Sequence, residues 1–598
     1  MSDNTGMVGC PGSRSRWLLG RVPKGLEWNR IRVCDGLEFV AKRHPKEMEG
    51  GRWIYVDGSV VPRLPYRGLA NGKVNEALVE DFINRFQEEF IHAVKGIFVI
   101  VVIERGSARI WNDHLGVRKV FIRSGGDSFL VGGEFADMAA FGGGDVALNP
   151  NAVAVNGLMH HFALGLTPIR GIRYSLGASR LRGGLEGLEE GRYWSSEKLI
   201  EGEIDAGIDP ETIAGMIADL LAAGVEDHKV GKVTLTLTGG MDSRTLLAAL
   251  LNKGIEPETF TFGHPDSSDA GNAREIASRL KLKHSVHFEP APTSEWFRKL
   301  SREIVKAGMG MTHIHRAHRL DGVKKEAMED GSAGMDLLLL GAMGGEGVRG
   351  VHFDDLITTE FVRRRWSEHH DPRLLARSRL DSYFIRFERG MVDDVLDQLA
   401  SASYFSGRKK EDEFHLLYDM TAPLHHGPDV LLYEGYSRIV LPIYLDIEYL
   451  ELLFRSPYSL LFKDNTSRNQ FKRINIPELN CRMINALEPS LAEIPFSNGF
   501  SPSEYLKGRA TYVVKRALRK YFRKREHPNF AIGSWMREFV GSELSGGLPE
   551  EVKAVFDLPG LQRALESDPL SVKEKDWHRF TDVVMMGNVL NRIKARKE

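Results

Sequence analysis

Cysteine is scarce in this chain, with Cys10, Cys34 and Cys481 the only three among 598 residues. They are too few and too widely spaced for a disulfide framework or a cysteine metal cluster, and a reducing interior is the expected setting. Long apolar runs are also missing, because the longest strongly apolar stretch, 97–103, is far too short to span a bilayer. The first residues lack the charged-then-apolar order of a signal peptide, so we expect a soluble, cytoplasmic protein.

An excess of one charge is equally absent, since 80 basic and 81 acidic side chains leave a net charge of -1. This balance gives no indication of nucleic-acid binding. No Gly-x-x-x-x-Gly-Lys-Ser/Thr run occurs, which excludes a Walker phosphate loop. With 598 residues, of which 42% are hydrophobic, the chain is long enough for two to four domains with large cores.

The most informative stretch runs from Val233 to Gly254. Residues 233–237 are apolar or β-branched and predict a buried parallel strand. The Leu- and Ala-rich residues that follow predict a helix that ends at Gly254. Between strand and helix lies the loop Thr238-Gly-Gly-Met-Asp-Ser243, whose composition is typical of a phosphate site.

Each residue type in this loop suits a nucleotide pyrophosphate. Gly239 and Gly240 lack a Cβ atom, so main-chain N–H groups can approach anionic oxygens at the positive end of the helix. Thr238 and Ser243 add hydroxyl donors. Asp242 alone would repel phosphate, so its presence predicts a bridging divalent cation, most simply Mg²⁺.

Two further strands and a helix are predicted directly downstream. Residues 259–263 and 284–288 read as strands, and 269–281 as a helix with Asp269 as its N-cap. This β-α-β-α-β alternation favours a doubly wound parallel sheet, which binds ligands at the carboxyl ends of its strands. Gly240 and Gly263 fall at such ends.

Upstream of residue 200 the pattern changes to short strands separated by Gly and Asp turn signals. These strands are predicted over 95–104, 108–112, 120–123 and 128–131, in the spacing that antiparallel hairpins require. The sequence therefore predicts a separate all-β or layered N-terminal domain.

The chain resembles the asparagine synthetase family in both regions. Its Thr238–Ser243 loop is similar to the Ser-Gly-Gly-x-Asp-Ser loop of ATP pyrophosphatases, which cleave ATP between the α and β phosphates. Gly96-Ile-Phe98, the segment 112–121 and Val131-Gly-Gly-Glu-Phe-Ala136 are similar, in this order, to segments of the family's glutaminase domain. Looser matches continue through 165–172 and 192–194.

The resemblance implies two domains, divided between 201 and 210. Residues 1–205 are expected to form an α+β, Ntn-hydrolase-like, layered glutaminase domain. Residues 206–598 are expected to form an α/β, doubly wound ATP-pyrophosphatase domain with a helical C-terminal part. The implied cofactors are ATP and Mg²⁺, and the implied reaction activates a carboxylate as an acyl-adenylate, which an amine then attacks.

The same resemblance assigns site residues. The expected pyrophosphate and ATP contacts are Leu237, Thr238, Gly239, Gly240, Asp242, Ser243, Phe262, Gly263 and Gly345. In the second loop, Gly345-Glu-Gly347 is kept, but Arg349 stands where the family has a metal-binding Asp. Glu346 is the expected replacement ligand beside Asp242, with Asp354 and Asp355 as stand-ins; a glycine-rich loop with a surface Glu is the alternative.

A family lysine that neutralises pyrophosphate and adenylate charge is expected further downstream. The cations in that interval are Lys463, Arg468, Lys472, Arg473 and Arg482. Lys472 is the preferred candidate, although spacing alone does not select it. The flanking segments 438–446 and 489–495 are similar to an Arg-x-Pro-Phe-Leu-Asp and a Pro-x-Leu-Ala-x-Ile-Pro stretch of the family.

One departure bears directly on function. The family's glutaminase uses a cysteine that becomes the N-terminal residue, with its own amino group as base. This chain begins Met1-Ser2-Asp3, and the nearest thiol, Cys10, would need an unusual cleavage. An inactive glutaminase relic is the favoured interpretation, with processing at Cys10 and other chemistry as alternatives.

The predicted function is therefore amide formation from ATP, a small-molecule or peptide carboxylate and an amine. The lost glutaminase chemistry favours lactam or macrolactam formation, as in β-lactam synthetases and lasso-peptide cyclases. Asparagine synthesis and a non-catalytic nucleotide-binding scaffold remain alternatives. Sulfur-transfer or tRNA-modifying pyrophosphatases are disfavoured, because they usually need catalytic cysteines.

Two remaining features have mainly structural interpretations. The stretch 507–525 predicts a basic amphipathic helix, which could hold a partner protein, an acidic peptide, RNA or a membrane surface, but a solvated helix is favoured. His313, His315 and His318 lie close in sequence without metal-ligand spacing on a helix, so we expect surface or capping histidines.

Overall fold

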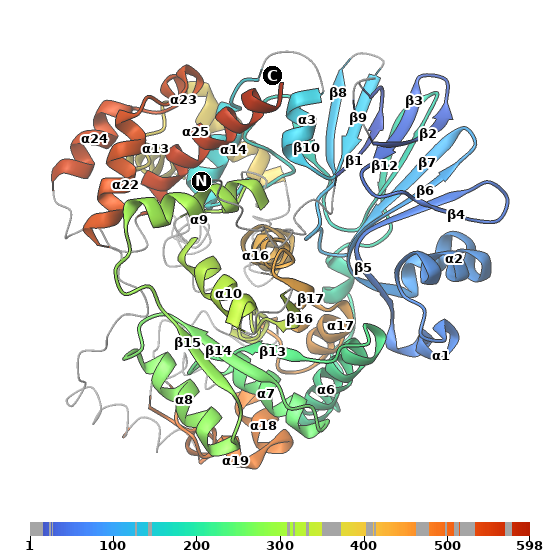
Figure 1. Cartoon of the computed structure of the whole chain (residues 1–598), viewed down its shortest axis with the longest axis vertical. Coiled ribbons are helices and arrows are strands. Elements are labelled where there is room, and N and C mark those ends of the chain that lie inside the picture. The colour runs from blue at the N-terminus through green and yellow to red at the C-terminus, as the bar shows by residue number, and fades with distance from the viewer. Residues whose placement is uncertain are drawn as a thin grey trace, which may run out of the picture.

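The computed structural model describes residues 16–22, 26, 28–125, 128–141, 146–307, 311–314, 317–329, 334–349, 372–401, 411, 414–461, 478–496, 499–507, 514, 533–567 and 577–597. These residues form two six-stranded antiparallel sheets, one five-stranded parallel sheet and the helices that cover them (Figure 1).

The two antiparallel sheets form an N-terminal sandwich. One sheet has the order β10-β8-β9-β1-β3-β2 and the other β12-β11-β7-β6-β5-β4. Their strands are β1 (Trp17–Gly20), β2 (Asn29–Cys34), β3 (Leu37–Ala41), β4 (Lys46–Glu47), β5 (Trp53–Pro62), β6 (Val94–Glu104), β7 (Ser107–Asn112), β8 (Phe121–Gly125), β9 (Ser128–Gly132), β10 (Ile172–Tyr174), β11 (Ser179–Gly184) and β12 (Gly187–Arg192). The predicted hairpins β6–β7 and β8–β9 are confirmed.

Alternating apolar side chains fill the space between the sheets. Trp17 and Phe39 of the first sheet pack in one buried cluster with Tyr55, Val101 and Ile110 of the second. Helix α2 (Asn75–Phe86) covers the outer face of the second sheet, and α3 (Phe135–Phe141) and α4 (Pro150–Met159) cover the first. The predicted layered α+β N-terminal part is confirmed.

The third sheet is wholly parallel, in the order β15-β14-β13-β16-β17. Its strands are β13 (Val233–Thr236), β14 (Glu258–Phe262), β15 (His284–His287), β16 (Met335–Leu339) and β17 (Ser437–Leu441). Starting from β13, the chain first adds β14 and β15 on one side and later adds β16 and β17 on the other. The strand order therefore reverses between β13 and β16. Open α/β sheets bind ligands at such a point.

Helices cover both faces of this sheet, as two buried faces require. Leu337 and Leu339 of β16 pack with α6 (Pro210–Asp227) and α7 (Asp242–Asn252), while Leu338 packs with α9 (Ser294–Ala307) and α10 (Ala317–Glu329). The remaining helices around the sheet are α8 (Ser268–Leu280), α16 (Gly427–Tyr433), α17 (Ile447–Arg455), α18 (Glu478–Leu487), α19 (Pro489–Ala492) and α20 (Pro502–Leu506).

One predicted helix start is wrong. The cap of α8 is Ser267, whose hydroxyl accepts the Ala270 N–H, whereas Asp269 lies inside the first turn. Ser267 has the extended backbone of an N-cap residue and precedes the first helical residue, so its side chain reaches the free N–H groups.

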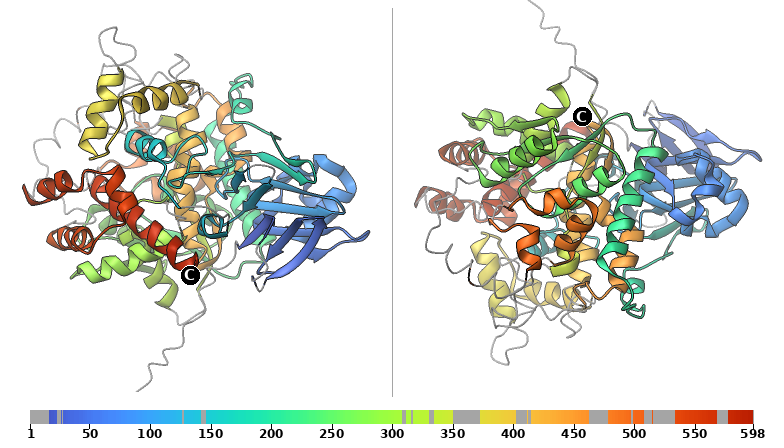
Figure 2. Two further views of the ribbon diagram at one scale, coloured as in Figure 1. Left: turned by 90° about the horizontal axis from the view of Figure 1, so that it is seen from above. Right: turned by 90° about the horizontal axis from the view of Figure 1, so that it is seen from below.

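The C-terminal part is helical, as predicted. It contains α13 (Pro372–Ser382), α14 (Arg389–Ser401), the π-helix η4 (Leu416–His426), α22 (Ser534–Ser545), α23 (Glu550–Val555), α24 (Leu558–Ser567) and α25 (His578–Lys597). Of these, α13, α14 and α22 to α25 lie on the side of the molecule away from the sandwich strands (Figure 2), yet α25 packs against α3. The π-helix η4 lies between them and the sandwich, and Lys119 contacts it.

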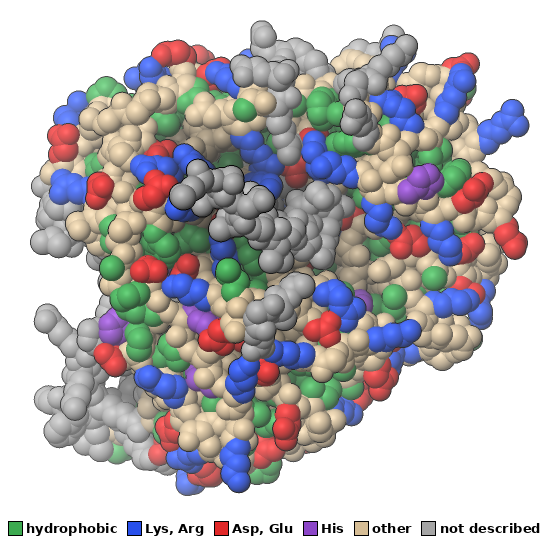
Figure 3. Space-filling model, in the orientation of Figure 1, with side chains coloured by type: hydrophobic (Ala, Val, Ile, Leu, Met, Phe, Trp, Pro, Cys, Tyr) green, Lys and Arg blue, Asp and Glu red, His purple; other side chains and the backbone are tan. Residues whose placement is uncertain are grey.

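The surface agrees with the nearly neutral composition. Basic and acidic side chains are interspersed over the face shown in Figure 3. Within the described residues, no helix has the length and apolar character needed to cross a bilayer.

Candidate active site

The predicted phosphate loop connects β13 to α7 at the strand-order reversal. Ser243 Oγ accepts the Thr238 N–H at 3.1 Å, and Thr238 Oγ1 accepts the Gly240 N–H at 3.2 Å. The two hydroxyl oxygens lie 3.2 Å apart, so one hydroxyl donates its proton to the other. The proton of the accepting hydroxyl is then available to a ligand. The side chains that were predicted to bind phosphate thus also hold the loop in shape.

Gly239 lies where side chains of α8 approach the loop. A Cβ atom there would lie 2.9 Å from Asn272 Nδ2 and 3.0 Å from Asp269 Oδ1. Asp269, predicted as a cap, therefore faces the loop instead. At the neighbouring strand end, the Gly263 N–H donates to the His287 carbonyl at 3.0 Å, with a φ of 121° that favours glycine.

The second glycine-rich loop follows β16 and contacts the first. A Cβ atom at Gly341 would lie 3.0 Å from the Ser243 nitrogen, and one at Gly344 would lie 2.8 Å from Asp242 Cγ. The second loop ends at the short helix α11 (Glu346–Arg349). Only glycine permits the two loops to approach this closely at the carboxyl edge of the sheet.

Three buried tyrosines surround the two predicted carboxylates. Tyr444 donates its hydroxyl proton to the Asp242 carbonyl at 2.9 Å, and its ring lies 5.4 Å from that of Tyr449. Burial raises the pKa of Tyr444 well above its usual value, and the charges of Asp242 and Glu346 add to the effect. Burial and Glu346 likewise raise the pKa of Tyr418. The charges of both carboxylates thus act on the same group of buried tyrosines.

The carboxylates suit a hard divalent cation. Glu346 Oε2 is buried and has no hydrogen-bond partner among the described residues. A buried, unpaired carboxylate oxygen is costly unless a cation or water satisfies it. Together with Asp242 it offers the oxygen ligands that Mg²⁺ prefers, next to a loop whose main-chain N–H groups suit phosphate oxygens.

Several predicted residues lie outside the described part of the chain. They are Lys472, Asp354, Asp355 and all of the basic stretch 507–525 except Lys507 and Val514. Of the other cations considered with Lys472, Arg482 is described: it pairs with Glu478 at 3.0 Å on the exposed side of α18. The lysine assignment stays a prediction.

Arg244, which directly follows the loop, holds the 489–496 segment. Its guanidinium donates to the Ile494 carbonyl and, at 2.9 Å, to the Pro495 carbonyl, and it lies 4.5 Å from the Phe496 ring centroid. Burial lowers its pKa to about 10. This contact brings the Ile494-Pro495 segment against the start of α7.

Residues 112–121, which are similar to a glutaminase segment, connect the N-terminal sandwich to the rest of the molecule. Arg118 is buried and pairs with Asp57 at 3.0 Å within the sandwich and with Glu434 at 2.5 Å outside it. Lys119 donates to the Pro423 carbonyl of η4 at 2.9 Å, and burial lowers its pKa to about 8. Asp113 accepts two N–H groups of this turn, while burial raises its pKa to about 6.

A cavity lies at this junction, between the sandwich and β17. Its lining includes Asp57, Asp113, Arg118 and Glu434, but none of the residues of the 238–243 loop. The cavity is therefore distinct from the phosphate site.

No described cysteine has the environment of an activated thiol. Burial raises the pKa values of Cys34 and Cys481 above their usual value. The first described strand begins with the fully buried Trp17. Cys10 and Ser2 lie outside the described residues.

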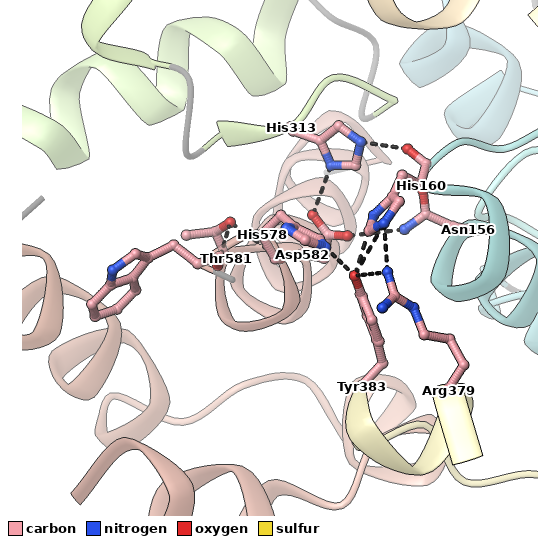
Figure 4. A network of polar contacts seen from close by, with 9 residues as sticks. Asn156, His160, His313, Arg379, Tyr383, His578, Thr581 and Asp582 are labelled. Carbon is pink, nitrogen blue, oxygen red and sulfur yellow. Dashed lines mark hydrogen bonds and ion pairs between the residues drawn. The ribbon is translucent and has the colours of Figure 1, made fainter. Parts of the chain in front are cut away.

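The prediction for His313 is wrong, because this residue is buried within a polar network (Figure 4). Its Nδ1 lies 3.0 Å from Asp582 Oδ1 of α25, while Asn156 of α4 donates to the other oxygen at 3.0 Å. The rings of His160 and His578 lie 4.2 Å apart. This network joins α4 of the sandwich to the C-terminal helix, a tertiary contact that local spacing does not reveal.

Comparison with known proteins gives one informative match. Residues 216–384 match the family model of asparagine synthase. No curated protein is significantly similar to the chain. Among solved structures, the chain is similar to glutamine phosphoribosylpyrophosphate (PRPP) amidotransferase from B. subtilis in complex with ADP and GMP, at 12% identity over 42% of this chain and 76% of that one, with a TM-score of 0.20.

A second structure, the allosteric regulatory enzyme of purine biosynthesis, is 10% identical over 46% of this chain and 75% of its own, with a TM-score of 0.21. Scores this low support no conclusion about fold or function. The family match, in contrast, includes β13, the phosphate loop, the second glycine-rich loop and Glu346. Residues 216–384 of this chain therefore match an asparagine synthase domain, as the resemblance to the asparagine synthetase family implied.

Proposed function

We propose that the protein is an ATP-dependent ligase that activates a carboxylate as an acyl-adenylate and joins it to an amine, releasing AMP and pyrophosphate. The observation that carries this proposal is the contact between the two loops, where Gly344 packs on Asp242 and Glu346 keeps a buried, unpaired oxygen. The family match supports amide formation in general.

Each group has a role in this reaction. The loop N–H groups other than those of Thr238 and Gly240, which donate within the loop, hold the departing pyrophosphate together with one hydroxyl proton of Thr238 or Ser243. The neighbouring ATP contacts are Leu237, Phe262, Gly263 and Gly345. Asp242 and Glu346 hold Mg²⁺, which when bound neutralises charge on the phosphates. Lys472 stabilises charge on the adenylate as it forms.

We further propose that residues 1–205 are a glutaminase-like, Ntn-type domain without glutaminase activity, and that 206–598 form the ATP-pyrophosphatase domain. The support is structural: Arg118 and Lys119 of the glutaminase-like motif bind Glu434 and the Pro423 carbonyl of the other half. Both side chains thus form contacts between the sandwich and the other half. The amine then comes from the substrate, as in lactam or macrolactam formation, and asparagine synthesis is the alternative.

The experiment is a product analysis with ATP, Mg²⁺ and a panel of amino acids and peptides that contain both a carboxylate and an amine. Wild-type protein should release AMP and pyrophosphate with at least one of them, with loss of water from the acceptor. Asp242→Asn should abolish this release and leave the fold unchanged, because the loop keeps its main-chain bonds. Unchanged turnover in Asp242→Asn would refute the site.

A non-catalytic nucleotide-binding scaffold is the second candidate, and Arg349 at the family's metal-binding position favours it. The same experiment separates the two. A scaffold would bind ATP but release neither AMP nor pyrophosphate with any acceptor, and Asp242→Asn would change only its nucleotide affinity.

A further inference from the structure

Helix α18 places one amide side chain directly behind the phosphate loop. Asn480 is 2% exposed, and its Nδ2 lies 3.5 Å from Asp242 Oδ1 and 3.4 Å from Thr245 Oγ1. Asp242 and Thr245 lie one turn apart on α7, on the face that α18 covers. The amide therefore spans the first turn of the helix that begins at the loop.

The donor and acceptor capacities of the three side chains fix the direction of these contacts. Thr245 donates its own proton to the Met241 carbonyl at 3.1 Å, so its oxygen is an acceptor for Asn480. The Asp242 carboxylate can only accept. Each N–H of the Asn480 amide thus has one acceptor, and one oxygen of Asp242 has a neutral donor.

The position of this amide is rigid. Leu479, Cys481 and Ile484 of α18 are buried in the same apolar cluster as Leu246 and Leu250 of α7. A buried donor on a packed helix selects one rotamer of the carboxylate that it contacts. Tyr444 also fixes the Asp242 main chain, because its hydroxyl donates to the Asp242 carbonyl.

We propose that Asn480 is a positioning residue, which binds Oδ1 of Asp242 and so directs the carboxylate toward the divalent cation. This inference rests on the proposed function, because it concerns the same site. The role proposed for Asn480 acts through Asp242, whose carboxylate it contacts. Its removal should leave ATP chemistry possible but make it demand more cation.

The test measures Mn²⁺ binding to the full chain in the presence of ATP, by electron paramagnetic resonance. Asn480→Leu should weaken Mn²⁺ binding about 10- to 100-fold, the range typical of lost outer-shell partners. In turnover assays the Mg²⁺ concentration for half-maximal rate should rise, while the rate at saturating Mg²⁺ recovers toward wild type. Asn480→Ala, which removes the amide without adding apolar bulk, should behave in the same way.

The chain offers a matched control in Asn252 at the other end of α7. Its Nδ2 donates to the Leu487 carbonyl of α18 at 3.4 Å, so it links the same two helices away from the loop. Asn252→Leu should keep wild-type Mn²⁺ affinity. Wild-type affinity in both Asn480 variants, or an equal loss in Asn252→Leu, would overturn the inference.

A different variant tests the proposed function, so its failure is distinguishable from failure of the positioning role. Asp242→Asn should abolish the bound Mn²⁺ signal if the cation site is correct. A loss in Asp242→Asn with none in the Asn480 variants refutes only the positioning role, whereas no loss in either refutes the site itself.

Discussion

Replacing Gly344 by alanine tests the contact between the two loops. The new Cβ atom would lie 2.8 Å from Asp242 Cγ and 2.6 Å from Tyr444 Cε2. Packed carbon atoms lie about 3.5–4.0 Å apart, so one partner must move by roughly 1 Å. Such overpacking costs about 1–3 kcal/mol of stability, and a displacement of about 1 Å at a reacting group costs on the order of 100-fold in rate.

The assay compares AMP release at saturating ATP and Mg²⁺ with the free energy of unfolding in urea. Gly344→Ala should lose about 100-fold in rate while remaining folded. The control is Gly215→Ala on α6, where a Cβ atom meets nothing within 4 Å. This variant should keep wild-type activity. Wild-type activity in Gly344→Ala would refute the close approach of Asp242 to the second loop.

Three further predictions address the cation, the buried histidines and glutamine. Glu346→Gln should raise the Mg²⁺ requirement and slow adenylation more than it weakens ATP binding, since it removes a charged ligand; unchanged Mg²⁺ dependence would point instead to Asp354 or Asp355. Burial lowers the pKa of His114 to about 3, so below pH 6.5 the unfolded chain binds a proton that the folded chain does not. As the pH drops below 6.5, this residue should lower the free energy of unfolding by about 1.4 kcal/mol per pH unit. Urea titrations at several pH values should show a smaller loss in His114→Gln than in wild type. Equal losses of unfolding free energy in the two proteins would contradict this assignment. Incubation with glutamine should yield no glutamate above background, with or without ATP; glutamate production that disappears in Cys10→Ala would restore a glutamine-dependent enzyme.

Sequence patterns predicted the local parts of this site. Strand β13, the turn at Gly239 and Gly240 and the start of α7 follow from a β-branched run, two glycines and a Leu-rich helix within one short stretch. The β-α-β-α-β alternation also predicted the parallel sheet. Such features depend on neighbours in the chain, and local chemistry is sufficient to identify them.

The long-range parts were missed. Tyr444 lies in the short helix η5 (Ile443–Leu445) after β17, and Asn480 approaches Asp242 because α18 packs against α7. Neither residue type suggests such a role by itself. His313 was assigned to the surface because its partner, Asp582, lies on the last helix. Tyr444 did lie in a segment that resembles the family, and this was the one available signal.

The Asp269 error has a local cause. Ser267 and Asp269 are both good capping residues two positions apart, and composition does not distinguish them. Packing does, because Asp269 faces Gly239 across the loop.

The proposed function requires that the β13–α7 loop supports cleavage of ATP between its α and β phosphates. Exchange of labelled pyrophosphate into ATP, measured across a panel of carboxylates, tests it most directly because it requires a reversible adenylate. We expect exchange with at least one acid in wild-type protein and none in Asp242→Asn. Formation of ADP and phosphate instead, or equal exchange in Asp242→Asn, would contradict it.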